Sequence, residues 1–264
     1  MATRKRATSA SAQLRARLSS GEAIGAVWLC LGSPAAAEAM AHPGPDVAVF
    51  DLQHGLWTRT GLEAAMAGVA GKTIPLVRTL SDRPEDIAAA LEAGAAGVIV
   101  PLVESAETAR AVVAATRYPP DGIRSAGGVR PLLDFPATFA SLQKDPPFVA
   151  VMIETAAGKD AVAEIAAVEG VDLVFVGTGD LALSLGLFPK IDDRHTQAVG
   201  EILAGARKAG CAAGAFSIDE SVGAKWRALG AQFTVLACDS EVLRARTAET
   251  VAKFQDAPPP SLDG

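Results

Sequence analysis

The sequence predicts a single (β/α)8 TIM barrel, because eight short apolar segments recur along the chain with helix-like segments between them. Each apolar segment is continuous rather than alternating in polarity, which is typical of a parallel strand buried on both faces. Eight such β-then-α units favour a closed barrel, with an open doubly wound sheet as the alternative. The expected strands are Ala26–Leu31, Val47–Asp51, Ile74–Arg78, Gly97–Pro101, Val149–Glu154, Asp172–Gly177, Ala212–Ser217 and Phe233–Ala237.

The segments between the strands carry Ala, Glu, Asp and Leu at helical spacing, as in Ser81–Ala93 and Thr155–Val168. Two helical segments end in glycine, at "LEAGAAG" and "ALGAQF", where a glycine can end a helix in the left-handed conformation. The stretch Tyr118–Pro147 is rich in Pro and Gly and shows no clear strand. We expect it to form a functional loop over the barrel mouth.

The length and composition fit one domain with a sizeable core. Half of the 264 residues are hydrophobic, and 24 Lys and Arg against 30 Asp and Glu give a net charge of -6. This balance does not favour nucleic acid or an anionic membrane, and no stretch approaches the ~18 apolar residues of a membrane span. We expect residues 1–20 to form a tail and short helix, residues 21–254 the barrel, and residues 255–264 a disordered tail.

The N-terminus and the cysteines carry information about location. We expect the basic N-terminal residues to form a solvated tail that leads into a helix, with a transit peptide as the alternative, and no apolar signal-peptide core follows them. The three cysteines lie far apart without CxxC spacing, which argues against structural zinc and a disulfide framework. We therefore expect a cytoplasmic protein. The residues concerned are Arg4, Lys5, Arg6, Arg15, Arg17, Cys30, Cys211 and Cys238.

Polar side chains follow several expected strands at their carboxyl ends, where barrel enzymes place their catalytic groups. The stretch "VAVFDLQHGLW" is a buried run that stops at Asp51, Gln53 and His54. Each polar residue has a structural alternative, because an aspartate can cap a turn, a histidine can be satisfied by its neighbours and an arginine can pair with an acid. Their convergence on one rim predicts a site. The others on this rim are Arg78, Glu154 and Asp180.

Glu154 and Asp180 lie one βα unit apart, so their carboxylates can meet at the barrel mouth. Such a pair repels, shares a proton or binds a hard cation, and a divalent ion completed by water and substrate oxygens resolves the repulsion best. The neighbouring "VGTGD" lacks the length and the lysine of a P-loop. Its backbone N–H groups suit a small carboxylate as well as a phosphate.

These residues resemble the HpcH/HpaI aldolase family of metal-dependent class II pyruvate aldolases, over about residues 20–250. The resemblance rests on ordered motifs, of which "RYPPDGIRS" and "MIET" followed by "GTGDLALSLG" are the most specific. The further motifs are "FDLQHG", "PLVRTLSD" and "LEAGAAGVIVPLVESAETAR". It implies reversible aldol cleavage of 4-hydroxy-2-oxo acids to pyruvate, or hydroxypyruvate, and an aldehyde through a metal-bound enolate.

The resemblance also implies roles for individual residues. Glu154 and Asp180 are expected to bind Mg²⁺, Mn²⁺ or Co²⁺, and Arg78 to steady the enolate oxygen. His54 is expected to act as acid and base with Asp51 beside it. The backbone N–H groups of Gly179 and Asp180 are expected to hold the pyruvate carboxylate. The family further implies a homo-oligomer, a hexamer, in which the C-terminal helix around residues 241–254 packs across subunits.

The sequence departs from the family pattern at four places. Gln53 stands where many members have Glu, and Glu92 stands where an Asp supports the histidine. Met152 replaces a Gln that helps to bind substrate, and "GTGD" replaces the more usual "GPAD". The changes at Gln53, Glu92 and Met152 leave open a non-catalytic barrel that binds a 2-oxo acid. A second alternative is a related barrel enzyme, a CoA-thioester lyase of the citrate or malyl lyase type. The aldehyde partner cannot be predicted from the residues.

Overall fold

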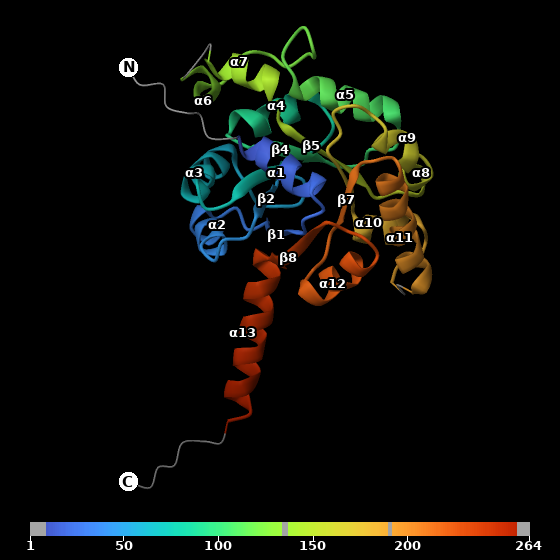
Figure 1. The fold of residues 1–264 in the computed structure, drawn as a ribbon. Coiled ribbons are helices and arrows are strands. Elements are labelled where there is room, and N and C mark those ends of the chain that lie inside the picture. Colours follow the sequence, from blue (N-terminus) through green and yellow to red (C-terminus); the bar gives the residue numbers. More distant parts are fainter. Residues whose placement is uncertain (1–8, 134–136, 190–191, 258–264) are drawn as a thin grey trace.

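A computed structural model describes residues 9–133, 137–189 and 192–257. Its eight parallel strands close into a barrel in chain order, with β1 paired to β8 (Figure 1), which confirms the predicted (β/α)8 fold and excludes an open sheet. Two strands match the predicted bounds, and the others differ by one or two residues at one or both ends. The strands are β1 Ile24–Leu29, β2 Val47–Asp51, β3 Ile74–Arg78, β4 Gly97–Val100, β5 Phe148–Ile153, β6 Leu173–Val176, β7 Ala212–Ala215 and β8 Phe233–Cys238.

Helices follow the strands around the outside of the barrel. The two glycines predicted to end helices adopt left-handed conformations, Gly94 after α4 at φ 112° and Gly230 after α12 at φ 101°. The single helix expected over Thr155–Val168 is two short ones, α8 and α9. The helices are α1 Ala10–Ser19, α2 Pro34–Ala41, α3 Arg59–Val69, α4 Pro84–Glu92, α5 Ala106–Thr116, α6 Val129–Leu132, α7 Ala137–Lys144, α8 Ala156–Asp160, α9 Val162–Ala166, α10 Thr178–Ser184, α11 Asp193–Lys208, α12 Glu220–Ala228 and α13 Asp239–Gln255.

Alternate residues of each strand pack into two separate apolar clusters. On β1, Trp28 packs in the barrel interior and Leu29 packs in the layer between strands and helices. Large aromatic side chains fill the interior: Trp28 stacks on Phe175 at 5.8 Å between ring centroids, and Phe175 meets Phe233 edge to face at 5.7 Å. Burying each such side chain contributes roughly 1.5–3 kcal/mol to folding. The interior is therefore a packed core that supports the residues above it.

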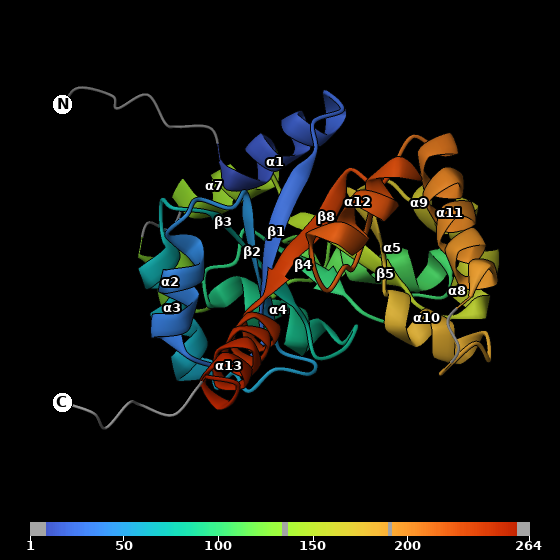
Figure 2. The same ribbon diagram turned by 90° about the horizontal axis from the view of Figure 1, so that it is seen from below.

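Helix α1 covers the amino end of the barrel (Figure 2), where Leu14 and Leu18 join the interior cluster. The expectation of a solvated basic tail is wrong for Arg15. Its guanidinium pairs with Asp145 and Asp172 at 2.9 and 2.8 Å, because α1 lies across the starts of β5 and β6. The N-terminal helix is therefore an integral part of the barrel's closed end.

The described residues of the stretch Tyr118–Pro147 lie at the amino end of the barrel, so the expectation of a loop over the mouth is wrong for them. The stretch connects the end of α5 to the start of β5, and α5 has already returned the chain to the amino end of the strands. Its described residues include two helices, α6 and α7, and Arg130 of α6 donates to the carbonyl of Glu63 at 2.8 Å.

Helix α13 extends away from the barrel (Figures 1 and 2), and beyond its buried first residue, Asp239, its side chains are largely exposed. The expected disordered tail over residues 255–264 falls mostly outside the described residues. None of the described helices is both long enough and apolar enough to cross a bilayer.

Candidate functional site

Asp51 and Arg78 form an ion pair at the carboxyl end of the barrel, where β2 and β3 end. The two residues are partners in the strand register, and both side chains are buried. Arg78 Nε donates to Asp51 Oδ1 at 2.8 Å, and Nη2 donates to Oδ2. Burial opposes ionisation of Asp51, but the hydrogen bonds and charge of Arg78, with the His54 N–H and Trp28, outweigh it and hold the pKa below its usual value.

Asp51 positions its neighbours on three sides. Its Oδ1 accepts the backbone N–H groups of Gln53 and His54 at 3.0 and 3.1 Å, and Oδ2 accepts the indole N–H of Trp28 at 3.1 Å. Trp28 lies beneath the pair, with the Arg78 guanidinium carbon 5.2 Å from its ring centroid. Within the described chain no acceptor is bonded to Arg78 Nη1, which leaves its N–H groups for a ligand.

Glu154, directly after β5, fits a cation. Its side chain is buried, Oε1 accepts the Leu102 N–H at 2.8 Å, and Oε2 has no hydrogen-bond partner among the described residues. Burial, with the nearby charge of Asp180, raises the Glu154 pKa to about 7. A buried carboxylate oxygen without a donor is costly unless a cation or a proton satisfies it. Two carboxylates together form the oxygen-only donor set that Mg²⁺ and Mn²⁺ prefer.

The backbone around Glu154 is adapted to this carboxylate. Leu102, which donates to it, has a positive φ of 55°, the one such value at a non-glycine position in the described ranges. At Gly177 a Cβ atom would lie 2.5 Å from Glu154 Oε2 and 2.8 Å from the Met152 methyl carbon. Only glycine fits there, so the Gly of "VGTGD" is required by close approach of the backbone to the site.

A cavity of ≈ 260 Å³ lies at the carboxyl end of the barrel, where Asp51, Arg78 and Asp180 are among the residues that line it. His54 is exposed at its rim, and Gly179 and Asp180 are exposed in the first turn of α10. The first backbone N–H of α10 that donates within the helix is that of Leu181, which bonds to the Gly177 carbonyl. The N–H groups of Gly179 and Asp180 come before it, so they have no acceptor within the helix. The lining residues are Trp28, Cys30, Asp51, His54, Arg78, Met152, Gly177, Thr178, Gly179, Asp180, Phe216 and Cys238.

Glu92 is the last residue of α4, and its Oε2 accepts from Arg59 Nη2 at 3.3 Å. Arg59 is the first residue of α3, which follows the loop that carries His54. Support of His54 by Glu92 stays a prediction.

Sequence reasoning missed several lining residues. Trp28 and Phe216 are apolar, and nothing in the sequence distinguishes an apolar residue of a cavity wall from one of the core. Cys30 and Cys238 are 208 positions apart, yet their sulfur atoms lie 4.0 Å apart. His195 was also missed: it is buried on α11 and its Nε2 bonds to the Thr178 carbonyl at 2.8 Å, which holds the turn before Asp180.

Comparison with known proteins identifies the family of the chain. The HpcH/HpaI aldolase/citrate lyase model matches residues 25–245. A hydroxypyruvate/pyruvate aldolase from Roseovarius nubinhibens is 35% identical over 247 residues, which cover 91% of this chain and 96% of that protein. A 4-hydroxy-2-oxovalerate aldolase from Novosphingobium aromaticivorans is 37% identical over 219 residues, covering 81% and 83%. The crystal structure of a family protein from Burkholderia cenocepacia J2315 matches with a TM-score of 0.86 at 32% identity, covering 92% and 99%. The chain therefore belongs to the HpcH/HpaI aldolase/citrate lyase family.

Proposed function

We propose that this protein is a divalent-metal-dependent class II aldolase that reversibly cleaves 4-hydroxy-2-oxo acids to pyruvate, or hydroxypyruvate, and an aldehyde. The observation that carries the proposal is the unpartnered, buried Glu154 Oε2 beside Asp180, next to a cavity lined by Arg78 and His54. The reaction class is supported by relatives that are named aldolases, at 35% and 37% identity.

Each charged group has a task in binding the 2-oxo acid. Glu154 and Asp180 would hold Mg²⁺, Mn²⁺ or Co²⁺, which when bound supplies Lewis-acid polarisation of the keto oxygen. Arg78, fixed by Asp51, donates from Nη1 to the substrate oxygen on which negative charge develops. The N–H groups of Gly179 and Asp180 donate to the substrate carboxylate, and Met152 forms an apolar part of the wall.

His54 moves the proton. In the cleavage direction an imidazole nitrogen of His54 accepts the proton of the 4-hydroxyl group, directly or through water, as the C3–C4 bond breaks. The same group returns a proton to the methylene carbon of the enolate, which gives the methyl group of pyruvate. Asp51 acts through position, since its Oδ1 accepts the His54 backbone N–H at 3.1 Å.

The two alternatives are less well supported by the site. A lyase acting on a CoA thioester calls for a basic surface that holds the nucleotide. Among the described residues that line the cavity, Arg78 is the only lysine or arginine, and its charge is paired with Asp51. A non-catalytic 2-oxo acid-binding barrel, suggested by Gln53, Glu92 and Met152, makes no use of an unpartnered Glu154 oxygen beside a rim histidine.

The direct test offers the purified protein pyruvate or hydroxypyruvate with a panel of aldehydes, from glyoxylate and glyceraldehyde to succinic semialdehyde. We expect condensation with at least one aldehyde, and chromatography of the products identifies the acceptor. Borohydride with pyruvate should leave activity intact, because no lysine lines the cavity in the described part of the chain. Covalent trapping by borohydride, or turnover that requires CoA, would contradict the proposal.

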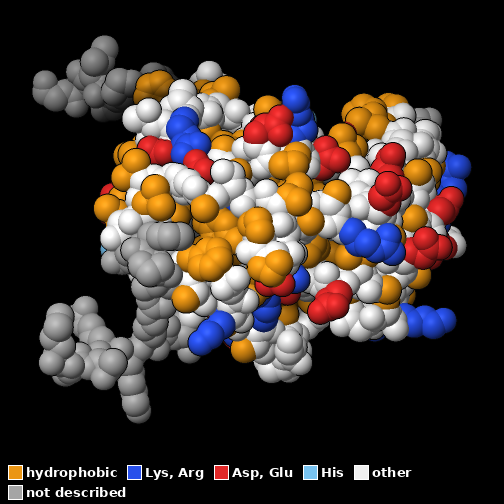
Figure 3. Space-filling model, turned by 90° about the horizontal axis from the view of Figure 1, so that it is seen from above, with side chains coloured by type: hydrophobic (Ala, Val, Ile, Leu, Met, Phe, Trp, Pro, Cys, Tyr) orange, Lys and Arg blue, Asp and Glu red, His pale blue; other side chains and the backbone are white. Residues whose placement is uncertain are grey.

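The proposal includes a homo-oligomer, a hexamer, in the cytoplasm. Helix α13 exposes Val242, Leu243, Val251 and Phe254, and Phe254 is 81% exposed. The face that carries α5, α6 and α7 also gathers hydrophobic side chains (Figure 3). Contiguous exposed apolar surface of this kind marks interaction sites. Three free cysteines favour a reducing compartment.

We expect the wild-type protein to be hexameric in light scattering at micromolar concentration. Replacing Leu243 and Phe254 together by Asp should shift it to smaller species, because each charge would have to be buried in an apolar contact. The matched control, Arg246→Asp, lies on the same helix where Arg246 pairs with Glu249, and should leave the assembly intact. A wild-type monomer would contradict this prediction.

A further inference from the structure

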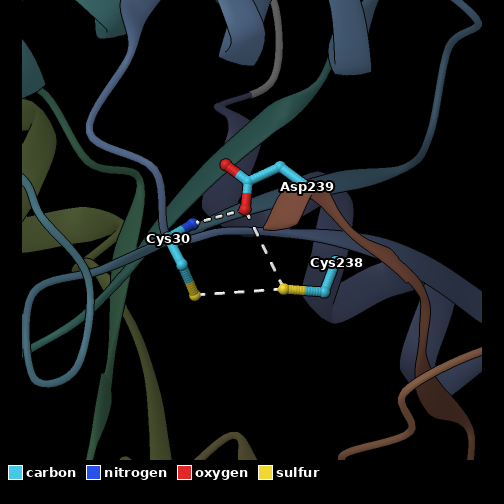
Figure 4. Close-up of side chains that lie close together, drawn as sticks. All are labelled: Cys30, Cys238 and Asp239. Atoms are coloured by element: carbon cyan, nitrogen blue, oxygen red, sulfur yellow. Dashed lines mark hydrogen bonds between the residues drawn. The ribbon is translucent and has the colours of Figure 1, made fainter. Parts of the chain in front are cut away.

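Two cysteines face each other in the wall of the cavity. Cys30 follows β1 and Cys238 ends β8, and these strands pair where the barrel closes. Their Sγ atoms lie 4.0 Å apart, and both residues line the cavity. Figure 4 shows the two thiol groups pointing toward one another with the carboxylate of Asp239 beside them. The proposed aldol mechanism uses none of these three side chains.

The Asp239 carboxylate is held in place by the backbone. Its Oδ1 accepts the N–H groups of Cys30 and Ser240 at 2.9 and 2.8 Å, and Oδ2 accepts the N–H of Leu31 at 3.0 Å. Oδ1 is the oxygen on the side of the thiols, 3.9 Å from Cys238 Sγ, so an ion there would be its third partner beside the two N–H groups. Metal-ligating carboxylates are commonly fixed by such hydrogen bonds. A carboxylate oxygen of Asp239 and the two sulfur atoms all lie within 4.8 Å of one another.

We propose that Cys30, Cys238 and Asp239 form a binding site for a thiophilic divalent ion, such as Zn²⁺ or Cd²⁺. Two sulfur ligands at about 2.3 Å from a tetrahedral ion lie about 3.8 Å apart, close to the 4.0 Å between these Sγ atoms. Soft thiolate ligands separate this site from the oxygen-only pair, Glu154 and Asp180, which suits harder ions. Since both cysteines line the cavity, the remaining ligand position is open to water or to a substrate oxygen.

The charges around the thiols favour a cation. Asp51 Oδ2 lies 3.6 Å from Cys30 Sγ, and Asp239 Oδ1 lies 3.9 Å from Cys238 Sγ. The contact with Cys30, helped by Ser240 and opposed by burial, lowers the pKa of Cys238, so a thiolate is accessible near neutral pH. The same contact and burial raise the pKa of Cys30. A bound cation releases that proton and offsets the neighbouring carboxylates.

The strand register argues against a disulfide between the same residues. Trp28, and not Cys30, is the Cα partner of Cys238. An offset of two residues between neighbouring strands separates the Cα atoms by about 8 Å, whereas a disulfide requires less than about 7 Å. The side chains therefore reach far enough to share an ion but not to form an unstrained S–S bond.

Titration with Co²⁺ tests the site, because the near-ultraviolet charge-transfer absorption of thiolate–Co²⁺ appears only with sulfur ligands. We expect the wild-type protein, and the double variant Glu154→Gln with Asp180→Asn, to develop this absorption up to one ion per chain. Zn²⁺ should then remove it by displacement. Cys30→Ala and Cys238→Ala should each weaken binding by at least about 10-fold. The matched control, Cys211→Ala, removes the remaining, buried cysteine and should leave the absorption unchanged.

Absence of thiolate absorption in the folded wild-type protein would overturn the proposal, as would equal absorption in Cys30→Ala. A Cys30–Cys238 disulfide found by mass spectrometry under mild oxidation, without ion binding by the reduced protein, would also overturn it. None of these readouts requires aldol turnover, so failure of the proposed function is distinguishable from failure of this site.

One consequence for catalysis rests on the proposed function. An ion at this site lies next to Asp51 and competes with Arg78 for its carboxylate, so Cd²⁺ should inhibit aldol cleavage. Each variant is compared with its own rate before Cd²⁺ is added. Inhibition that is lost in Cys238→Ala supports the site, and inhibition that persists there assigns the effect of Cd²⁺ to Glu154 and Asp180.

Discussion

Glu154→Gln should abolish aldol turnover and weaken divalent-metal binding by more than about 100-fold. The variant keeps the shape of the side chain but removes one of two carboxylates, and loss of even an outer partner of a metal ligand costs about 10- to 100-fold. Isothermal titration with Mn²⁺ measures the affinity, and chelation of the wild-type protein should reproduce the loss of activity until Mg²⁺, Mn²⁺ or Co²⁺ is restored. Glu164→Gln, an exposed site on α9, is the matched control.

The same variant should change how stability depends on pH. Because the Glu154 pKa is raised to about 7, the metal-free folded state holds this proton more tightly than the unfolded chain does. The free energy of unfolding should therefore fall as pH rises from about 4.5 to about 7, by roughly 3 kcal/mol. Urea unfolding of the metal-free proteins should show this fall in the wild type and not in Glu154→Gln.

Bound metal should restore the lost stability of the wild type above pH 7, since it binds only the folded state. Full activity of Glu154→Gln, full wild-type activity in excess chelator, or parallel stability curves for the two proteins would each contradict the assignment of Glu154.

His54→Ala should slow aldol cleavage by about 10²–10⁴-fold, which is the usual contribution of a general acid or base. The metal-loaded wild type should exchange the methyl protons of pyruvate with deuterated water without any aldehyde, and the variant should slow this exchange by a similar factor. Nuclear magnetic resonance follows the exchange. Because His54 is exposed at the rim, we expect the variant to fold and to bind metal normally.

His42→Ala is the matched control, since His42 is an exposed histidine that caps α2 at the amino end of the barrel. Arg78 gives a less direct test. Arg78→Ala should also slow both reactions, but it leaves the buried Asp51 unpaired, which typically costs about 3–5 kcal/mol. Unchanged exchange in His54→Ala would contradict the proton transfer and would reassign His54 to positioning the aldehyde.

The sequence predicts the barrel and most of its rim for one physical reason. Buried parallel strands need continuous apolar segments, so a polar residue at a strand end is conspicuous, and strand ends share one rim. Asp51, Arg78, Glu154 and Asp180 were found in this way. Their pairing was not, because the stagger between β2 and β3, which makes Asp51 and Arg78 partners, is not encoded in a local pattern of the sequence.

The failures have equally physical causes. The stretch Tyr118–Pro147 was assigned to the wrong end of the barrel because richness in Pro and Gly does not reveal at which end of the barrel a connecting segment lies. The Cys30–Cys238 contact is invisible in the sequence because the first and last strands meet only when the barrel closes.

Because α1 closes the amino end of the barrel, ligands can enter and leave the site only at the carboxyl end. With Leu14 and Leu18 beneath an interior packed with aromatic rings, the site opens in one direction only. Both cleavage products must leave by the entrance that the substrate used. In the proposed mechanism the oxo acid binds deepest, against Arg78, so we expect it to leave after the aldehyde and to bind first in synthesis. A barrel closed at its amino end would thus favour an ordered mechanism without a moving lid.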